Sequence, residues 1–458
     1  MTEEEISRLG PALTEFLSGF RKFFPRLPTF KHLGTYCRGL LSDLARKSVE
    51  PIALSAGTAV RTLQEFLTHH AWDHGAMRDA MHRRIVRDHL PAPDAARAKS
   101  GLGVIGWVDE TSVAKKGDQT PGVQRQYCGA SGKTDNCIVT VHLAVGCGAF
   151  MTMLDSDLFL PEKTWDQDRE RCRQAHIPDS VVYRPKSDIA LEQIKRAVAN
   201  GVRFDWLTFD EWYGSKPAFL DALEAMGLLY VCEVPKHLPC FSVFPKYNSL
   251  QRSFGPKRAD SAVIRGKPFR GTKWRKIKLQ RKTLPPQVWE VRAGQVYLSR
   301  GGNPTPRTYW LIAARNVQTG EYKYFISNAP PKTALATLMK VAFTRAGVEH
   351  VFRIAKTEIG FAHFEGRSYR GLIRHMTLCQ LTMLFLAEQT TRLRGEKSRD
   401  HHGANRAGPQ HSVPRMAPAP NQQIRHRTRR IGHSIPPETK HNRKSVKAWK
   451  ASLSNVAL

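Results

Sequence analysis

The sequence is poor in acidic residues and lacks a long apolar run. Lys and Arg number 71 against 40 Asp and Glu, which gives a formal charge of +31 and an isoelectric point near 10.1. The longest apolar stretch, residues 376–387, is too short to span a bilayer and carries Gln380. The acidic start of the chain is unlike a secretory signal. These absences predict a protein with no membrane partner.

Closely spaced cysteines are also absent. None of the eight cysteines forms a C-x-x-C pair, so neither a zinc ribbon nor a disulfide framework is indicated. A reducing, cytoplasmic compartment is therefore expected.

The excess of positive charge favours a polyanionic partner, because each neutralised phosphate releases counterions. Acidic membranes are the rival partner. However, the basic residues are spread over most of the chain and do not flank a hydrophobic anchor.

A length of 458 residues predicts two to four domains. Residues 1–100 show apolar positions at helical spacing and are rich in Arg, Lys and His, which predicts a helical DNA-binding domain. The expected helices are 13–24, 33–48, 59–69 and 75–89.

Strand patterns begin near residue 101 and continue to residue 235. The order is three strands, two helices, a strand, a helix and a strand, which predicts an α/β domain with a mixed sheet flanked by helices. The expected strands are 104–109, 137–146, 149–154, 204–210 and 228–235.

Residues 236–328 interrupt this scheme with short β-rich runs separated by Pro and Gly. Between residues 257 and 282 stand eleven Lys or Arg and one acid, with aromatic residues between them. A solvated face is the plain interpretation of such a run. Interleaved aromatic and basic side chains favour DNA contact, which we expect at Lys273, Trp274 and Arg275.

Helical patterns return in residues 329–391 and are expected to complete the α/β domain that begins near residue 101. Residues 392–458 hold fifteen Lys or Arg and three acids, with few large apolar residues. This composition predicts disorder or partial order in a basic tail with nonspecific affinity for DNA.

Three acidic residues stand at informative places. Asp109 and Asp210 each end an apolar run, and Glu349 lies in a helical stretch. Converging carboxylates bind hard divalent cations, and paired cations can clamp both oxygens of a phosphoryl displacement. In so basic a chain, this arrangement predicts an enzyme that cuts and joins DNA.

Each acid also has a structural interpretation. Asp109 can cap a turn, Asp210 can end a strand before a helix, and Glu349 can belong to an ion-pair lattice with Arg345. Three neighbouring acids are the alternatives for the site, although strand and helix geometry turns them away from it: Glu110, Glu211 and Glu358.

The order of these residues resembles the DDE transposases of bacterial insertion sequences, in the cut-and-paste branch that carries a β insertion before the final Glu. The pattern is Asp109-x-Thr111, then Asp210, then Arg345-x-x-x-Glu349 followed by Lys356. The stretches 125–129, 132–136 and 361–368 resemble one subgroup of that branch, and the resemblance covers residues 30 to 390 approximately. The pattern's Tyr, three residues before the Arg, is Ala342 here.

The resemblance implies a ribonuclease-H-like fold and a magnesium triad of Asp109, Asp210 and Glu349. It also implies two Mg²⁺ ions (with Mn²⁺ as a possible substitute), cleavage at inverted-repeat ends, strand transfer into target DNA, and a homodimer on double-stranded DNA. A bacterial, nucleoid-associated enzyme is expected.

Arg345 and Lys356 match the family's basic residues near the cut. Lys115, Lys116 and Arg125 follow the first Asp in an expected Gly-rich loop, where DNA contact is expected. Two rival functions remain at this point. One is a structure-specific nuclease on the same fold, and the other is a catalytically inactive DNA-binding protein descended from a transposase.

Overall fold

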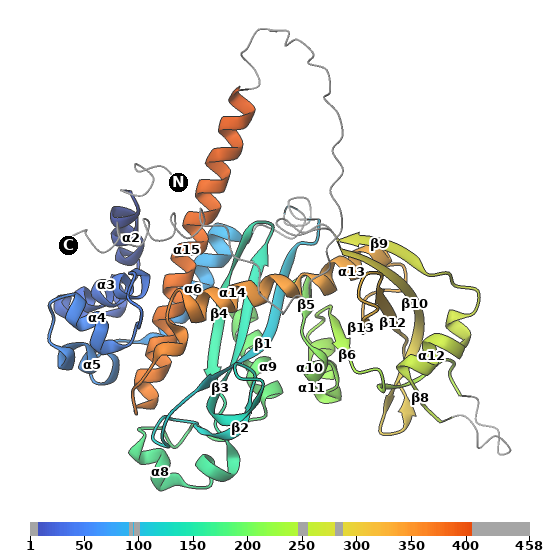
Figure 1. Ribbon diagram of the computed structural model, residues 1–458, viewed down its shortest axis with the longest axis horizontal. Helices are drawn as coiled ribbons and strands as arrows, with labels where there is room; N and C mark the ends of the chain where they lie inside the picture. The colour runs from blue at the N-terminus through green and yellow to red at the C-terminus, as the bar shows by residue number, and fades with distance from the viewer. Residues whose placement is uncertain (1–7, 91–94, 96–100, 246–254, 280–286, 405–458) are drawn as a thin grey trace, which may run out of the picture.

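The computed structural model shows an N-terminal group of helices, a mixed sheet with helices on both faces, and a β-rich lobe (Figure 1). None of the helices that the structure describes is long and apolar enough to cross a membrane. The structure describes residues 8–90, 95, 101–245, 255–279 and 287–404.

The N-terminal helices begin and end where prolines and capping residues allow. Pro28 lies in the first turn of its helix and so does not interrupt it, because a first-turn residue has no intrahelical partner for its N–H. A short helix around Pro51 was not expected from the sequence. The helices are α2 (Leu9–Ser18), η1 (Arg21–Phe23), α3 (Leu27–Leu41), α4 (Val49–Ser55), α5 (Val60–Thr68) and α6 (His74–His89).

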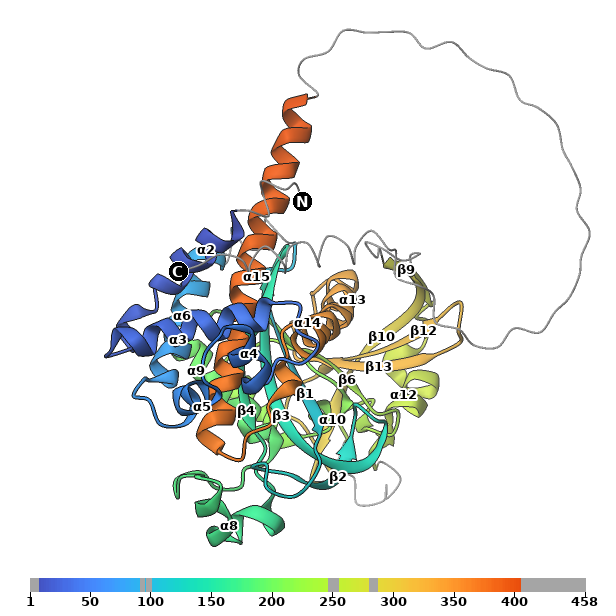
Figure 2. The same cartoon turned by 60° about the vertical axis from the view of Figure 1, so that its left-hand side comes forward.

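These helices share one continuous core with the rest of the chain and pack against the long helix α15 (Tyr369–Ala404) (Figure 2). Buried polar contacts reinforce the packing. Lys47 is 1% exposed, and its ammonium donates to the carbonyls of Leu40 and Glu358. Glu358 follows the last residue of α14 (Arg345–Thr357), so Lys47 ties this helix to the N-terminal group.

The catalytic sheet has the strand order β2-β3-β1-β5, and β4 also pairs with β3. β1, β3 and β4 are antiparallel, whereas β5 is parallel to β1, so the predicted mixed α/β sheet is confirmed. Gly106 permits the close approach of β5, because a Cβ there would stand 2.6 Å from a Leu207 methyl carbon. The strands are β1 (Val104–Ala114), β2 (Gln124–Cys128), β3 (Lys133–Cys147), β4 (Phe150–Leu158) and β5 (Trp206–Thr208).

Two local expectations about this sheet were wrong. β1 does not end at Asp109 but continues for five residues to Ala114, because the facing strand β3 supplies partners along its whole length. The expected Gly-rich loop after Lys115 is largely a hairpin, in which Arg125 of β2 pairs with Asn136 of β3. Neither pairing is visible in the local apolar pattern.

Helices cover both faces of the sheet. Asp109 contacts Arg345 of α14, whereas the next residue, Glu110, pairs with Lys186 of α9. Successive strand residues point to opposite faces, so α9 and α14 lie on opposite sides of β1. The remaining helical segments are a π-helical turn η2 (Glu162–Asp166), α8 (Arg169–Gln174), α9 (Lys186–Ala199), α10 (Glu211–Gly214), α11 (Pro217–Ala225), α13 (Leu335–Phe343) and η4 (Phe361–His363).

The β-rich lobe is an eight-stranded sheet that includes a strand expected in the catalytic sheet. β6 pairs along its length with β13, and a single parallel bridge, Leu207 to Tyr230, links it to the catalytic side. A boundary at residue 235 therefore divides neighbouring strands of one sheet. The elements are β6 (Val231–Val234), β7 (Pro239–Phe241), β8 (Lys257–Arg258), α12 (Ala259–Arg265), η3 (Lys267–Phe269), β9 (Arg275–Leu279), β10 (Gln287–Arg300), β11 (Asn303–Pro304), β12 (Tyr309–Asn316) and β13 (Tyr322–Ser327).

The last helix also extends further than expected. α15 continues past residue 391 to Ala404, into the segment where the disordered tail was expected to begin. Arg, Glu and Lys have high helix propensity, which accounts for the continuation. The rest of the predicted tail, residues 405–458, lies outside the described residues.

The buried His142 predicts acid sensitivity. It pairs with Asp109 in the β1–β3 ladder, and burial, followed by the charge of Lys356, lowers its pKa to about 3. An unfolded histidine titrates near the ordinary value of 6.5, so this stability is complete above pH 6.5 and is lost as the pH falls toward 3. We expect His142 to cost about 2 kcal/mol of unfolding free energy between pH 7 and pH 5.

Urea denaturation at both pH values would measure this cost in the wild type and in His142→Gln, which cannot protonate. The pH dependence should be weaker in the variant by that amount. Equal pH dependence in the two proteins would contradict the assignment.

Candidate active site

The centre of the candidate site is an ion pair between β1 and α14. Asp109 Oδ2 accepts a hydrogen bond from Arg345 Nη2 at 3.1 Å, and the Asp109 side chain is 15% exposed. Burial raises the pKa of Asp109; the Arg345 charge opposes this rise, and the nearby Asp210 carboxylate adds to it. The two predicted strand acids therefore lie within electrostatic reach of one another.

Asp210 lies in the turn that follows β5. It is the N-cap of α10, and its Oδ1 accepts from the backbone N–H groups of Trp212 and Tyr213 at 3.0 and 3.2 Å. Capping of this kind satisfies helix donors that have no partner inside the helix. Both bonds use Oδ1, so among the described residues Oδ2 of Asp210 is left for a ligand.

Two contacts fix the position of α14 on the sheet. Trp107 of β1 donates from its indole N–H to Thr344 Oγ at 3.0 Å, immediately before the helix begins. Farther along the helix, Phe352 packs on His142 of β3 with ring centres 5.3 Å apart. These contacts determine which face of α14 meets Asp109.

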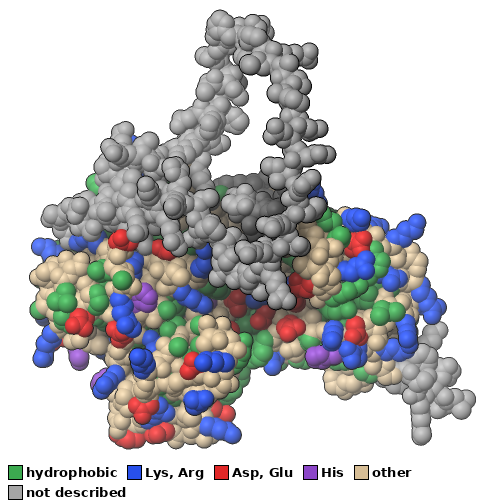
Figure 3. All heavy atoms as spheres, viewed as in Figure 1, with side chains coloured by type: hydrophobic (Ala, Val, Ile, Leu, Met, Phe, Trp, Pro, Cys, Tyr) green, Lys and Arg blue, Asp and Glu red, His purple; other side chains and the backbone are tan. Residues whose placement is uncertain are grey.

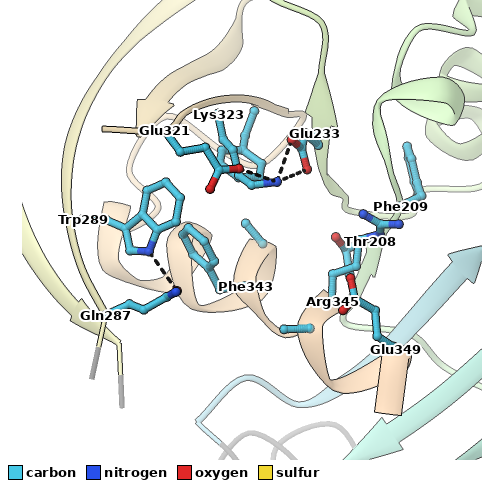
Figure 4. A pocket seen from close by; sticks show the side chains of 13 residues that line it. Thr208, Phe209, Glu233, Gln287, Trp289, Glu321, Lys323, Phe343, Arg345 and Glu349 are labelled. Carbon is cyan, nitrogen blue, oxygen red and sulfur yellow. Dashed lines mark hydrogen bonds and ion pairs between the residues drawn. The ribbon is translucent and has the colours of Figure 1, made fainter. Parts of the chain in front are cut away.

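Glu349 lies one turn after Arg345 and lines the same cavity, of about 200 Å³. In Figure 4, Arg345 and Glu349 lie beside Thr208 and Phe209 on one side, with Trp289 and Phe343 on the other. Glu349 is thus on the same side of the sheet as Asp109. The remaining lining residues are Glu233, Gln287, Glu321, Lys323, Phe325, Ala342 and Ala346.

The site attracts a cation. Burial alone would lower the pKa of Arg345, but the carboxylates of Asp109 and Asp210, with a contribution from Glu233, raise it. Carboxylate oxygens are the ligands that Mg²⁺ prefers, so Asp109 and Asp210 carry donor atoms of the right kind for a divalent ion. Across the described part of the chain, no three His, Cys, Asp or Glu residues are close enough to enclose a metal. The guanidinium of Arg345 is the cation that contacts Asp109 in this structure.

A buried phenol beside these acids was missed in the sequence. Tyr213 is 0% exposed, and its hydroxyl makes no hydrogen bond within the described residues. Burial raises its pKa well above the usual value, and the charges of Glu110, Asp210 and Asp109 raise it further. An unpartnered buried donor facing acids can satisfy a ligand that arrives there. Its only sequence signal was its place three residues after Asp210.

The basic residues predicted to contact DNA fall into two groups around this centre. Lys356 lies on α14, and burial lowers its pKa while the Asp109 charge opposes that shift, so it is near the acids. Lys115 is directed elsewhere: its ammonium donates to the Phe364 carbonyl, and burial lowers its pKa to about 8. Lys116 and Arg125 are exposed.

The predicted contacts in the lobe lie apart from the carboxylates. Lys273, Trp274 and Arg275 are exposed at the start of β9, which pairs only with β10 among the described strands. Trp274 is 6.4 Å from the Tyr322 ring, and the Arg315 guanidinium lies 5.8 Å from the Trp274 ring centre. This exposed aromatic and basic surface suits a nucleic-acid backbone and its bases.

The neighbouring acids have other positions. Glu110 pairs with Lys186 on the opposite face of the sheet, Glu211 is exposed in the first turn of α10, and Glu358 caps the end of α14. Figure 3 shows several Asp and Glu side chains at the hollow beside the β-rich lobe, and others among Lys and Arg on the outer surface.

Comparison with known proteins shows the family of the chain. A family model described as DDE superfamily endonuclease matches residues 22–292, which is more than half of the chain. The chain belongs to the DDE superfamily of endonucleases. The match contains Asp109 and Asp210 and ends before Arg345.

A curated relative extends the similarity. Over 364 residues the chain is 29% identical to the probable transposase for insertion sequence element IS701 of Microchaete diplosiphon, covering 78% of this chain and 82% of that protein. The predicted DDE family and a metal-dependent DNA-cleaving enzyme are therefore confirmed.

The unpartnered phenol yields a prediction about stability. An unsatisfied buried polar group costs on the order of 1–3 kcal/mol, so its removal should not destabilise the protein. Without added metal, we expect Tyr213→Phe to leave the free energy of unfolding unchanged or to raise it by up to about 1 kcal/mol.

Tyr36→Phe is the matched control, because the Tyr36 hydroxyl bonds His375 Nδ1 at 2.9 Å in a buried setting. The control should destabilise the protein in the same urea titration. A clear loss of stability in Tyr213→Phe would mean that its hydroxyl has a partner.

Proposed function

We propose that this endonuclease is a DNA transposase that cuts the ends of its own element and transfers them into target DNA. The observation that carries the proposal is the Arg345–Asp109 contact, with Asp210 within electrostatic range and Glu349 one turn along the helix. The named function of the relative and the charge of +31 support it.

In this proposal, Asp109, Asp210 and Glu349 hold two Mg²⁺ ions, with Mn²⁺ as a substitute. When bound, such ions supply the Lewis acidity that lowers the pKa of the attacking water and stabilises the leaving oxygen. Asp210 contributes its Oδ2, because Oδ1 caps α10. Tyr213 donates its hydroxyl to a carboxylate or water in the assembled site.

When the site assembles, Arg345 releases Asp109 and binds a DNA phosphate in its place. A guanidinium binds phosphate and carboxylate with the same fork of donors, so the exchange preserves its hydrogen bonding. Lys356, on the same helix, places a second positive charge near the scissile phosphate. The 3′ hydroxyl released by cleavage then attacks a target phosphodiester, which forms one phosphorus–oxygen bond and breaks another.

The remaining parts of the chain take up DNA at a distance from the cut. We assign DNA binding to the N-terminal helices within residues 1–100 and to the surface of Lys273, Trp274 and Arg275, with Lys116 and Arg125 as further phosphate contacts. A homodimer on double-stranded DNA brings two ends together. The enzyme acts on bacterial nucleoid DNA in the cytoplasm.

A structure-specific nuclease on the same fold would cleave without preference for element ends and without joining them. An inactive descendant of a transposase would bind DNA but would tolerate the loss of its acids.

The test is metal-dependent nicking of a supercoiled plasmid that carries the ends of the element. Asp109→Ala, Asp210→Ala and Glu349→Gln should each lower cleavage by about 10²-fold or more, because the transition state loses a charge-stabilising group. DNA binding should change little. A second plasmid added as target should acquire joined ends only with the wild type.

Glu211→Gln and Glu358→Gln are matched controls, because each removes an acid next to Asp210 or at the end of α14. Both should retain cleavage. Wild-type activity in Asp109→Ala would contradict the proposal, and cleavage without joining would favour the nuclease.

A further inference from the structure

Two lysine side chains pack near the ring of an exposed tryptophan close to Asp210. Trp212 is 38% exposed, and the ammonium of Lys216 lies 4.4 Å from its ring centre. The ammonium of Lys186 lies 5.5 Å from the same ring and 5.5 Å from the ring of Phe159. We call Trp212, Lys186 and Lys216 the indole–lysine cluster.

The tertiary structure builds this cluster from three separate elements. Lys186 begins α9, Trp212 lies in α10, and Lys216 immediately precedes α11. Cations are attracted to an aromatic face by about 0.5–1 kcal/mol at exposed sites. The indole therefore holds the two ammonium groups at defined positions, so a ligand meets a partly ordered pair of charges.

The cluster adjoins both strand acids of the candidate site. The backbone N–H of Trp212 donates to Asp210 Oδ1 at 3.0 Å. Lys186 pairs with Glu110, the residue after Asp109, at 2.8 Å. Because Glu110 and Asp109 point to opposite faces of β1, Lys186 lies on the face of this strand opposite to Arg345.

The charge of the cluster is incompletely compensated. Glu110 pairs with Lys186, but no acid within the described residues forms an ion pair with Lys216. Lys186 and Lys216 place two positive charges against one aromatic ring, and a phosphate that contacts either ammonium would gain a charge-assisted hydrogen bond.

We infer that the indole–lysine cluster binds the phosphodiester backbone of the DNA strand on the side of Asp109 and Asp210 opposite to Arg345. The inference rests on the proposed function, because it takes DNA as the substrate of these acids. It assigns Arg345 and Lys356 to the backbone on one side of the cut and Lys186 and Lys216 to the other side. Trp212 positions the two lysines.

Salt-dependent binding tests the phosphate contact directly. The probe is a duplex carrying the terminal repeat of the element, with EDTA present so that no cleavage occurs. Each phosphate contact contributes about 0.9 to the slope of log affinity against log salt. Lys216→Gln should therefore lower the slope by about one, and Lys216→Arg should preserve it.

Lys195→Gln is the matched control, because Lys195 is exposed on the same helix as Lys186 but lies farther along it. It should leave the slope unchanged. Trp212→Leu keeps both charges but removes the ring on which the two ammonium groups pack. It should therefore weaken binding with a smaller change of slope than Lys216→Gln.

Crosslinking locates the contact on the DNA. All eight native cysteines are buried, so a thiol-directed photocrosslinker attached to Lys216→Cys reacts at one chosen place. It should crosslink to nucleotides next to the cleavage position, whereas Lys195→Cys should not.

The outcomes separate the two proposals. Suppose that the wild type binds the end duplex, that Lys216→Gln keeps the full slope, and that position 216 crosslinks no better than position 195. The inference is then wrong, and the proposed function stands. Equal displacement of DNA by polyglutamate would also overturn it, because the cluster would then recognise charge alone. If the wild type does not prefer the end duplex, the proposed function fails and this inference fails with it.

Discussion

The ion pair between Asp109 and Arg345 is the interaction on which the arrangement of the site depends. It joins a strand and a helix that are 236 residues apart in sequence. Once α14 is held against β1 in this register, Glu349 and Lys356 are placed by helix geometry alone, one and about three turns farther along. Trp107 and Thr344 secure the start of the same helix. A change in the seating of α14 would therefore move every predicted site residue that it carries.

The electrostatics of the molecule are divided between its surface and its centre. The chain carries +31 overall, yet the carboxylates of Asp109, Asp210 and Glu233 act on Arg345 at the candidate site. A basic exterior concentrates DNA near the protein, and an acidic centre repels phosphate unless cations intervene. Arg345 supplies one such cation from within the chain, and its raised pKa reflects the attraction of the surrounding carboxylates.

The β-rich lobe is part of the site's architecture because its sheet begins next to the catalytic strands. β6 follows β5 through the Leu207–Tyr230 bridge and then pairs with β13. The cavity that contains Glu349 is consequently lined from both sides, with Phe209 near the catalytic strands and Trp289 on β10. A ligand in this cavity would contact α14 and the lobe together.

The sequence by itself determined the mixed sheet, the β-rich lobe, the family and the order of the three acids, because apolar periodicity, charge and motif spacing are local properties of the chain. It did not reveal that β1 continues beyond Asp109, that β6 pairs with β13, or that the Lys115 ammonium is engaged by a carbonyl.

The tertiary structure alone decided these points. It also placed the Tyr213 hydroxyl among acids and gathered two lysines on Trp212. Each depends on contacts between segments that are remote along the chain, and a local pattern carries no information about which remote partner a strand edge or a side chain will meet.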